Sequence, residues 1–415
     1  MGRVLITAFW LATLPGIALA DDAPSRHETV IGIDVGYVHM SGLPSWTEGS
    51  VGKLRYQDDG VVFSRAFLDY RGRMTDTLSA HVVLEAYDDG LGNAVDFTQA
   101  YVEWRPLPRS ATRFRLKVGA FYPRISLENV DPGWSSRYTL NSSAINTWVA
   151  EELRTIGTEL TVSRRPASLG GAHTFSLNAA AFVANDPAGS LLAWKGWSVH
   201  DRQTRFSDNL PLPPLPTIQP GEIFENQDPY VDPFREIDNR VGYYLNGEWR
   251  FGNKLLVRVM HYDNRADPEV IDSGQYAWET KFEHIGVQTT LPADIGLITQ
   301  WMFGSTVMGP VINGAHAVDV EYDSYFILLT RAFDKHRVSA RYDNFHVTQN
   351  DDTGEDNNAE YGHAWTLGYQ YQYSEKVSIA AEWLSIKTHH CGWQYYGLPT
   401  TATEEQAQLM LRIRF

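Results

Sequence analysis

Apolar and polar residues alternate with a period of two along most of the chain. Within residues 113–118 (RFRLKV), every second residue is apolar and the residues between them are Arg or Lys. This period is typical of a β-strand with one apolar and one polar face. Sixteen such strands are predicted, and they begin near Val30, Val61, Thr77, Phe97, Arg113, Arg154, Ala172, Arg240, Lys254, Phe282, Ile295, Val320, Arg337, Tyr361, Val377 and Glu405.

The connections between the predicted strands alternate between short and long. Residues 252–253 form a tight link, whereas the third outer loop (residues 123–152) and the fourth (residues 184–239) are long and polar. Short periplasmic turns that alternate with long outer loops are typical of barrels in the bacterial outer membrane. The predicted fold class is all-β: a single antiparallel transmembrane β-barrel of about 16 strands, with short periplasmic turns and long outer loops.

The two ends of the chain agree with this fold. Residues 405–415 alternate strictly and end in Phe415, which resembles the closing strand of outer-membrane barrels, where a terminal Phe addresses the barrel assembly machinery. Residues 1–20 have a cation, an apolar stretch and an A-x-A-type end, so they are predicted to be a Sec-type signal peptide cleaved after Ala20. Residues 21–29 are then a short periplasmic N-terminal segment, and residues 30–415 form the barrel with its loops.

Composition narrows the function. The chain contains 13 Trp and 21 Tyr, residue types that concentrate at membrane–water interfaces. Cys391 is the single cysteine, which excludes an intramolecular disulfide and a cysteine-built metal site. The net charge of −15 argues against nucleic-acid binding. The histidines lack metal-ligand spacing, so we expect no metal, no cofactor and no enzymatic activity.

One segment resembles a known family. Residues 119–128 (GAFYPRISLE), beginning at Gly119, are similar to a segment of phosphate- and polyphosphate-selective outer-membrane porins, with a looser likeness from Asp96 to Leu160. The resemblance implies a sixteen-stranded, homotrimeric barrel that passes anions along Arg and Lys side chains. This chain departs from that pattern because it is strongly acidic and has no evident lysine-rich loop.

Inward-facing cations and the third outer loop supply the candidate pore residues. We expect a pore-lining anion track formed by Arg71, Arg73, Arg113, Arg115, Lys117, Arg337, Arg341, Arg412 and Arg414. The alternative is that acidic residues on the same face, such as Glu103 and Glu159, pair with these cations structurally. If the third outer loop folds inward instead of capping the rim, its constriction candidates are Arg124, Glu128, Asp131, Trp134, Arg137, Tyr138 and Trp148.

The predicted function is that of an outer-membrane porin: a water-filled channel for passive diffusion of small hydrophilic solutes, with anions or phosphate as the candidate preferred solutes. One alternative is a carbohydrate channel in which Trp134, Tyr138 and Trp148 stack on sugars. Another is a non-conducting barrel that acts as an adhesin, a scaffold or an enzyme. The expected partners are outer-membrane lipid, lipopolysaccharide, the assembly machinery and small solutes. The sequence does not name the solute.

Overall fold

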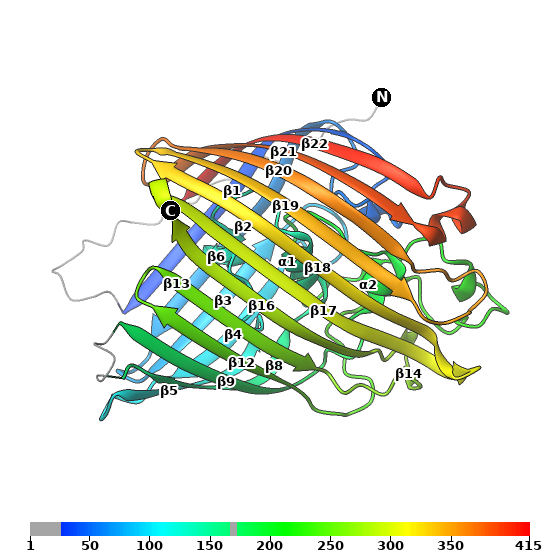
Figure 1. Cartoon of the computed structure of the whole chain (residues 1–415), viewed down its shortest axis with the longest axis horizontal. Helices are drawn as coiled ribbons and strands as arrows, with labels where there is room; N and C mark the ends of the chain where they lie inside the picture. The colour runs from blue at the N-terminus through cyan, green and yellow to red at the C-terminus, as the bar shows by residue number, and fades with distance from the viewer. Residues whose placement is uncertain (1–25, 167–171) are drawn as a thin grey trace.

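The computed structural model describes residues 26–166 and 172–415. The predicted signal peptide, residues 1–20, lies outside the described residues, as does most of the predicted segment 21–29. The described residues form one closed barrel of sixteen tilted antiparallel strands (Figure 1). Each strand pairs with its neighbours along the chain, and the first strand pairs with the last to close the cylinder.

The strands follow the predicted order. Around the barrel they are β1 (His27–Ser41), β2 (Gly60–Arg73), β3 (Leu78–Ala86), β4 (Val95–Trp104), β5 (Thr112–Phe121), β8 (Thr155–Arg164), β9 (His173–Val183), β12 (Gly242–Phe251), β13 (Leu255–Asp263), β16 (Glu279–Leu291), β17 (Ile295–Ile312), β18 (Ala315–Phe333), β19 (His336–Gln349), β20 (Glu360–Gln372), β21 (Val377–His390) and β22 (Thr401–Arg414). All sixteen predicted strands are present, and the predicted starts differ from the observed ones by a few residues. The fold class is confirmed.

The outer surface of the barrel is apolar where the strands cross the membrane. On β20, the outward-facing Trp365 and Leu367 are about half exposed, whereas the neighbouring inward-facing Ala364 and Thr366 are fully buried. Large apolar side chains remain on such a surface when lipid covers them, and a closed ladder leaves no strand edge unpaired in the hydrocarbon. Among the described residues, no helix is long and apolar enough to cross a membrane.

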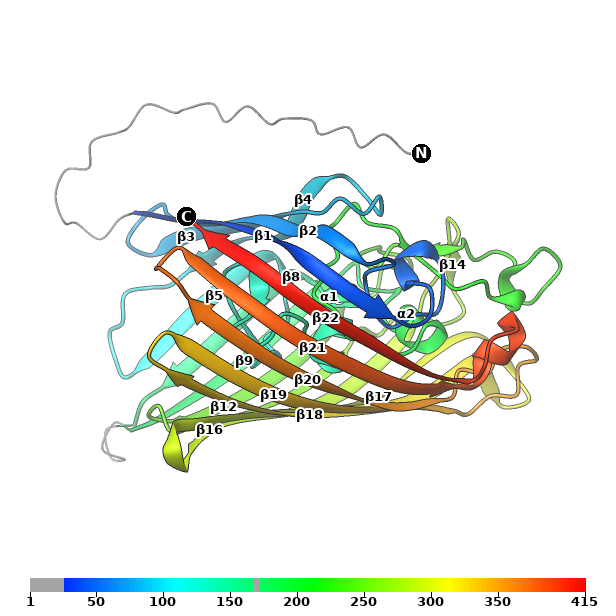
Figure 2. The ribbon, with the colours of Figure 1, turned by 90° about the horizontal axis from the view of Figure 1, so that it is seen from above.

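The long loops lie at one end of the barrel, and two of them enter it (Figures 1 and 2). The third outer loop carries α1 (Ala144–Glu152), every residue of which is buried, and the fourth carries α2 (Ser190–Trp194). The remaining short elements are the strands β6 (Asn129–Asp131), β7 (Ser135–Ser136), β10 (Leu210–Pro211), β11 (Tyr230–Val231), β14 (Ile271–Asp272) and β15 (Gln275–Tyr276), and the 3-10 helices η1 (Trp46–Glu48), η2 (Pro132–Trp134), η4 (Pro216–Ile218), η5 (Pro292–Asp294) and η6 (Cys391–Tyr396).

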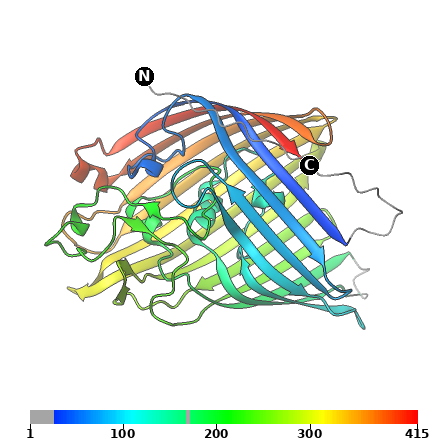
Figure 3. The ribbon, with the colours of Figure 1, turned by 180° about the vertical axis from the view of Figure 1, so that it is seen from behind.

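A hydrophobic core lies inside the barrel, between these loops and the wall. Trp148 of α1 packs edge-to-face against Trp197 of the fourth loop and against the wall residues Phe282 and Tyr322, with ring centroids 5.4–6.1 Å apart. Such pairs are the preferred geometry for buried aromatic rings. Seen from the opposite side, the inward segments lie behind β1 and β2 (Figure 3). The outer half of the lumen is therefore largely filled by the protein's own loops.

The seam between β1 and β22 yields a prediction. A Cβ atom at Gly36 would lie 2.1 Å from the Leu409 carbonyl oxygen and 2.5 Å from Met410 Sδ. We expect Gly36→Leu to lower the free energy of unfolding by about 1–3 kcal/mol, because overpacking displaces the closing strand. Urea unfolding followed by tryptophan fluorescence measures this change. Ala407→Leu, on the outward face of β22, is the matched control; equal stability of both variants contradicts the prediction.

Candidate functional site

The third outer loop, residues 123–152, is held inside the barrel by Arg341 of β19. This fully buried guanidinium forms ion pairs with Glu128 of the loop at 2.5 Å and with Asp343 of its own strand at 2.7 Å. It also donates hydrogen bonds to the carbonyl oxygens of Asn141 and Ser142 at 2.8 and 2.9 Å. Charge-assisted bonds of this kind are strong where water is excluded. Arg341 is thus the anchor of the loop.

Other strands fix the same loop from different sides. Glu382 of β21 accepts a hydrogen bond from the backbone N–H of Asn141 at 3.0 Å. The guanidinium of Arg258, on β13, donates to the carbonyl oxygens of Ile125 and Ser126 at 3.2 and 2.9 Å. Because the contacts come from well-separated strands, the loop crosses the lumen at a defined level. The inward position of this loop is what creates a constriction.

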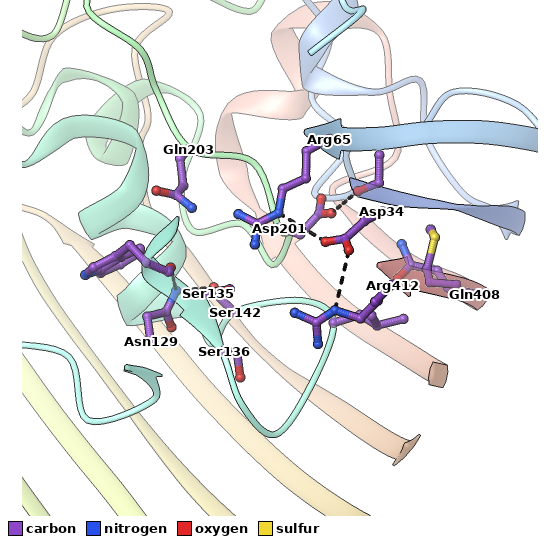
Figure 4. Close-up of a pocket in the computed structure, with 14 residues that line it drawn as sticks. Asp34, Arg65, Asn129, Ser135, Ser136, Ser142, Asp201, Gln203, Gln408 and Arg412 are labelled. Carbon is purple, nitrogen blue, oxygen red and sulfur yellow. Dashed lines mark hydrogen bonds and ion pairs between the residues drawn. The ribbon is translucent and has the colours of Figure 1, made fainter. Parts of the chain in front are cut away.

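A narrow polar cavity, which we call the eyelet, lies between this loop and the wall (Figure 4). Its volume is about 20 Å³, close to the space of one water molecule. Two carboxylates and two guanidiniums face it, from Asp34, Asp201, Arg65 and Arg412. Hydroxyl and amide groups complete its polar lining, from Ser64, Asn129, Ser135, Ser136, Ser142, Gln203 and Gln408.

Charges of both signs meet across the eyelet. Asp34 lies 3.2 Å from Arg65 Nε and 3.7 Å from Arg412 Nε (Figure 4). Asp201, from the fourth loop, accepts from Arg55 at 2.9 Å and from Ser64 at 2.7 Å. Burial raises the pKa of Asp201, but Arg55, the Ser64 hydroxyl and Arg65 together outweigh burial and hold that pKa below its ordinary value. The eyelet therefore holds ionised groups of both signs close together.

Below the eyelet, the periplasmic mouth is basic. One cavity of about 490 Å³ is lined by Arg26, Arg71, Arg73 and Arg105, with Glu28 and Asp76 as its acidic residues. A second cavity, of about 420 Å³, is lined by Arg105, Arg113, Arg115 and Arg124, with Asp76 as its acidic residue. We call these two cavities together the vestibule. Guanidiniums outnumber carboxylates in both, so the vestibule attracts anions.

The three cations predicted to form a ladder on β5 differ in their access to the vestibule. Arg113 is exposed at the mouth. Arg115 lies 3.6 Å from Glu103 and donates to Thr161 at 3.1 Å, and about a fifth of its side chain is accessible. Lys117 is deeper and almost buried, 3.5 Å from Glu159. Pairing of these cations with carboxylates, which was the predicted alternative to an anion track, thus increases from the mouth inward.

The other predicted track residues divide in the same way. Arg71 and Arg73 are exposed in the vestibule, and Arg337 is half-buried over the ring of Tyr138. Arg412 and Arg414 pair with Asp34, the latter at 2.6 Å. Arg341 corrects the prediction: it is inaccessible and fully used as the loop anchor, because a buried guanidinium needs partners for all its donors.

The predicted constriction residues also take several roles. Arg124 lines the vestibule, and Arg137 pairs with Asp131 at 2.8 Å on the exposed side of the loop. Trp134 stacks on Tyr122 with centroids 4.0 Å apart and reaches the eyelet. Trp148 is buried in the core. The proposed sugar slide of Trp134, Tyr138 and Trp148 therefore has no continuous exposed row, because core packing takes up Trp148.

Most eyelet residues were not found from the sequence, among them the charged residues Asp34, Arg65 and Asp201. Asp34 and Arg65 are charged residues on inward positions of β1 and β2, and the two-residue pattern of those strands contains that signal. Asp201 and Gln203 belong to the fourth loop, which has no periodicity. The position of a loop residue cannot be read from sequence periodicity, because only the tertiary structure places the loop against the wall. The sequence therefore locates wall residues better than loop residues.

Three carboxylates meet at the base of the fourth loop, from Asp186, Glu236 and Asp238, with one oxygen of each lying within 4.8 Å of the others. Asp186 accepts hydrogen bonds from the backbone N–H groups of Ile237 and Asp238 at 2.5 and 3.2 Å, which joins the two ends of the loop. Burial and the two neighbouring carboxylates raise the pKa of Asp186 to about 7. The stability of the loop base therefore depends on pH.

The barrel, the inward loop and the charged eyelet define the class of the protein: a porin-type β-barrel of the bacterial outer membrane. The sequence model of the family described as phosphate-selective porin O and P matches residues 52–194, about a third of the chain. This match confirms the resemblance predicted from residues 119–128. It covers the end of the first outer loop, the inward loop and α2.

Solved structures agree on the fold. The outer-membrane channel DcaP of Acinetobacter baumannii has a TM-score of 0.53 at 9% identity, covering 94% of this chain and 97% of that chain. The anion-selective porin of Comamonas acidovorans has a TM-score of 0.51 at 13% identity, covering 94% and 99%. A loop-deletion mutant of OmpT, an outer membrane protein of Vibrio cholerae, scores 0.50 at 11% identity, covering 94% and 99%. No curated protein is similar enough in sequence to match.

Together, the fold and the family match place the chain in the bacterial outer membrane. They point to a channel and not to an enzyme.

The anchoring role of Arg341 is testable. Arg341→Gln leaves Glu128 and Asp343 buried without their cation, and breaking such a pair costs about 3–5 kcal/mol. We expect the third loop to detach, so trypsin should cleave after Arg137 faster than in the unaltered protein. Timed digestion with mass spectrometry measures the rate. Arg73→Gln, at the exposed mouth, is the control, and the same slow cleavage in both variants contradicts the anchoring role.

The carboxylate cluster gives a pH prediction. The raised pKa means that native Asp186 retains its proton up to about pH 7, whereas the unfolded loop loses it near pH 4. Stability of the loop base is therefore full at low pH and falls as pH rises through about 7. Hydrogen-exchange protection of the Ile237 amide should be higher at pH 5 than at pH 8. Asp186→Asn should flatten this difference and Asp58→Asn should not; an unchanged pH dependence in Asp186→Asn refutes the assignment.

Proposed function

We propose that the chain is an outer-membrane porin that forms a water-filled channel for passive diffusion of small hydrophilic solutes, with a preference for anions. The observation that carries the proposal is the excess of guanidiniums in the vestibule, directly below the charged eyelet. Transport needs no reacting group, since the charge and width of a constriction select the solute. The family match and the anion-selective porin among the proteins of similar fold also support an anion-preferring channel.

The path we propose runs from the vestibule through the eyelet. Arg113 and Arg115 collect anions at the mouth, and Arg65 and Arg412 receive them at the constriction. Asp34 and Asp201 weaken the binding there, so that an anion is released again, as conduction requires. Because the eyelet has room for about one water, larger solutes cross only when the inward loops shift.

Two other functions are weaker. A carbohydrate channel needs exposed aromatic rings in a row, and Trp148 is buried in the core. A non-conducting scaffold, adhesin or enzyme gains support from the filled outer half of the lumen. The vestibule argues against it, since a purely structural barrel has no need of exposed guanidiniums such as Arg113 at its mouth.

The resemblance to the porin family also suggests how the protein is secreted and assembled. We propose that the chain is secreted by the Sec route, that the barrel assembly machinery recognises the strand ending in Phe415, and that three copies form a homotrimer within lipid and lipopolysaccharide. The exposed terminal Phe415 and the apolar outer face of β22 are the features that favour this route. The phosphate preference of the family remains one candidate within the anion class.

Bilayer recording tests the proposal. The purified protein in planar bilayers should give discrete conductance steps, and the reversal potential under a KCl gradient should show anion preference. Removing Arg113 and Arg115 by a double Ala substitution should lower the anion-to-cation permeability ratio several-fold. A unit charge about 6 Å from the ion's path contributes about 0.7 kcal/mol in water, or roughly threefold per charge.

The matched control is Arg331→Ala, which removes an exposed arginine at the periplasmic end of β18 on the outward face. It should leave the permeability ratio unchanged. Absence of conductance steps favours the non-conducting barrel, and block by oligosaccharide without ion preference favours the carbohydrate channel. Equal selectivity in the double variant and the control refutes the anion track.

A further inference from the structure

The outside of the barrel has an apolar groove on the face formed by β8, β9, β12 and β13. Its volume is about 470 Å³, and its walls are apolar side chains from Val162, Phe175, Leu177, Trp249, Val257 and Val259. Leu177 is 70% exposed, the largest exposure of any leucine in the described residues. All these residues lie on the outward face of their strands.

Gly247 forms the floor of this groove. It lies opposite Val259 on β13 and Leu177 on β9, and a Cβ atom there would be 3.4 Å from Val259 and 3.9 Å from Leu177. Neighbouring outward positions on the same strand carry Leu245 and Trp249. The missing side chain therefore makes a furrow between larger neighbours, about four residues or roughly 13 Å long along the strands.

The lower end of the groove is at the periplasmic boundary of the membrane. The outward rings of His173, Phe175, Trp249 and Phe251 gather there, and His173 stacks within 6.4 Å of Phe175 and 6.0 Å of Trp249. Aromatic girdles of this kind lie at the headgroup level of outer-membrane barrels. The rest of the groove is thus level with the acyl chains of the periplasmic leaflet.

A cation stands at that end. Arg164 is exposed, closes the groove, and shares the outward face of β8 with Val162. No carboxylate within residues 26–166 and 172–415 forms an ion pair with it. A guanidinium without a partner at headgroup level is matched to a phosphate, which it binds through two parallel N–H groups.

We propose that this groove binds one phospholipid of the periplasmic leaflet, with an acyl chain along Gly247 and the phosphate on Arg164. An acyl chain in the furrow gains van der Waals contacts with its walls, and the phosphate of the same lipid satisfies the guanidinium. A flat apolar face favours a second subunit. A narrow furrow that ends in a cation is instead complementary in shape to one acyl chain and in charge to the phosphate of the same lipid. The proposal depends on the membrane location and not on conduction.

Native mass spectrometry of the folded full-length protein, titrated with dioleoylphosphatidylglycerol in mild detergent, tests it. We expect one lipid to be retained with higher affinity than the rest. Gly247→Leu fills the furrow and should abolish that tight site, and Arg164→Gln should weaken it roughly tenfold. The matched controls are Ala381→Leu, on the outward face of β21, and Arg331→Gln, and both should bind like the unaltered protein. Heat-dependent gel migration confirms that each variant is folded.

Four results overturn the proposal. The first is equal lipid retention by Gly247→Leu and the unaltered protein. The second is loss of the tight lipid in Arg331→Gln to the same degree as in Arg164→Gln, which means general attraction to anionic lipid. The third is a change in the trimer fraction of Gly247→Leu with lipid retention unaltered, which means that a second copy covers the groove. Displacement of the lipid by millimolar inorganic phosphate also contradicts it, because the acyl chain should hold it.

Discussion

The structure depends on one constraint: in the hydrocarbon core, each backbone N–H and C=O needs a partner within the protein. The ladder between β1 and β22 meets this need by closing the cylinder. On the inner side of the seam, Asp34 binds Arg65 of β2 and both Arg412 and Arg414 of β22. Closure then fixes the direction of every side chain, since successive residues alternate between lipid and lumen.

Once charged side chains point into a confined lumen, they have to find partners or water. Where the inward loop reaches the wall, it provides these partners: Arg341 binds Glu128, and Arg258 binds carbonyl oxygens of the inward loop. At the periplasmic ends of β5 and β2, Arg113 and Arg73 remain exposed. The same type of residue thus builds the plug at one level and a basic mouth at another.

The eyelet is where these two regions meet. Its carboxylates come from a strand and a loop, Asp34 and Asp201, and its guanidiniums Arg65 and Arg412 come from strands. A site built from both kinds of element changes when the loops move, while its wall charges stay in place. On the outside, one missing side chain at Gly247 changes an otherwise lipid-covered wall into a furrow. The width of the eyelet therefore depends on loops and strands together, whereas the furrow on the outer surface depends on the single position 247.

The sequence by itself determined the sixteen strands, their direction, the inward positions of Arg113, Arg115 and Lys117, and the alternation of turns and loops, because a period of two is local and the membrane enforces it. It did not determine which inward cation would be accessible: Arg341 and Arg113 look alike in the sequence, yet one is buried in an ion-pair network and the other faces water. Nor did it find Asp201, which reaches the eyelet from a loop without periodicity. Only the tertiary structure decided these points, because partners such as Glu128 and Arg341 are far apart in the chain and meet only when the barrel closes around its own loops.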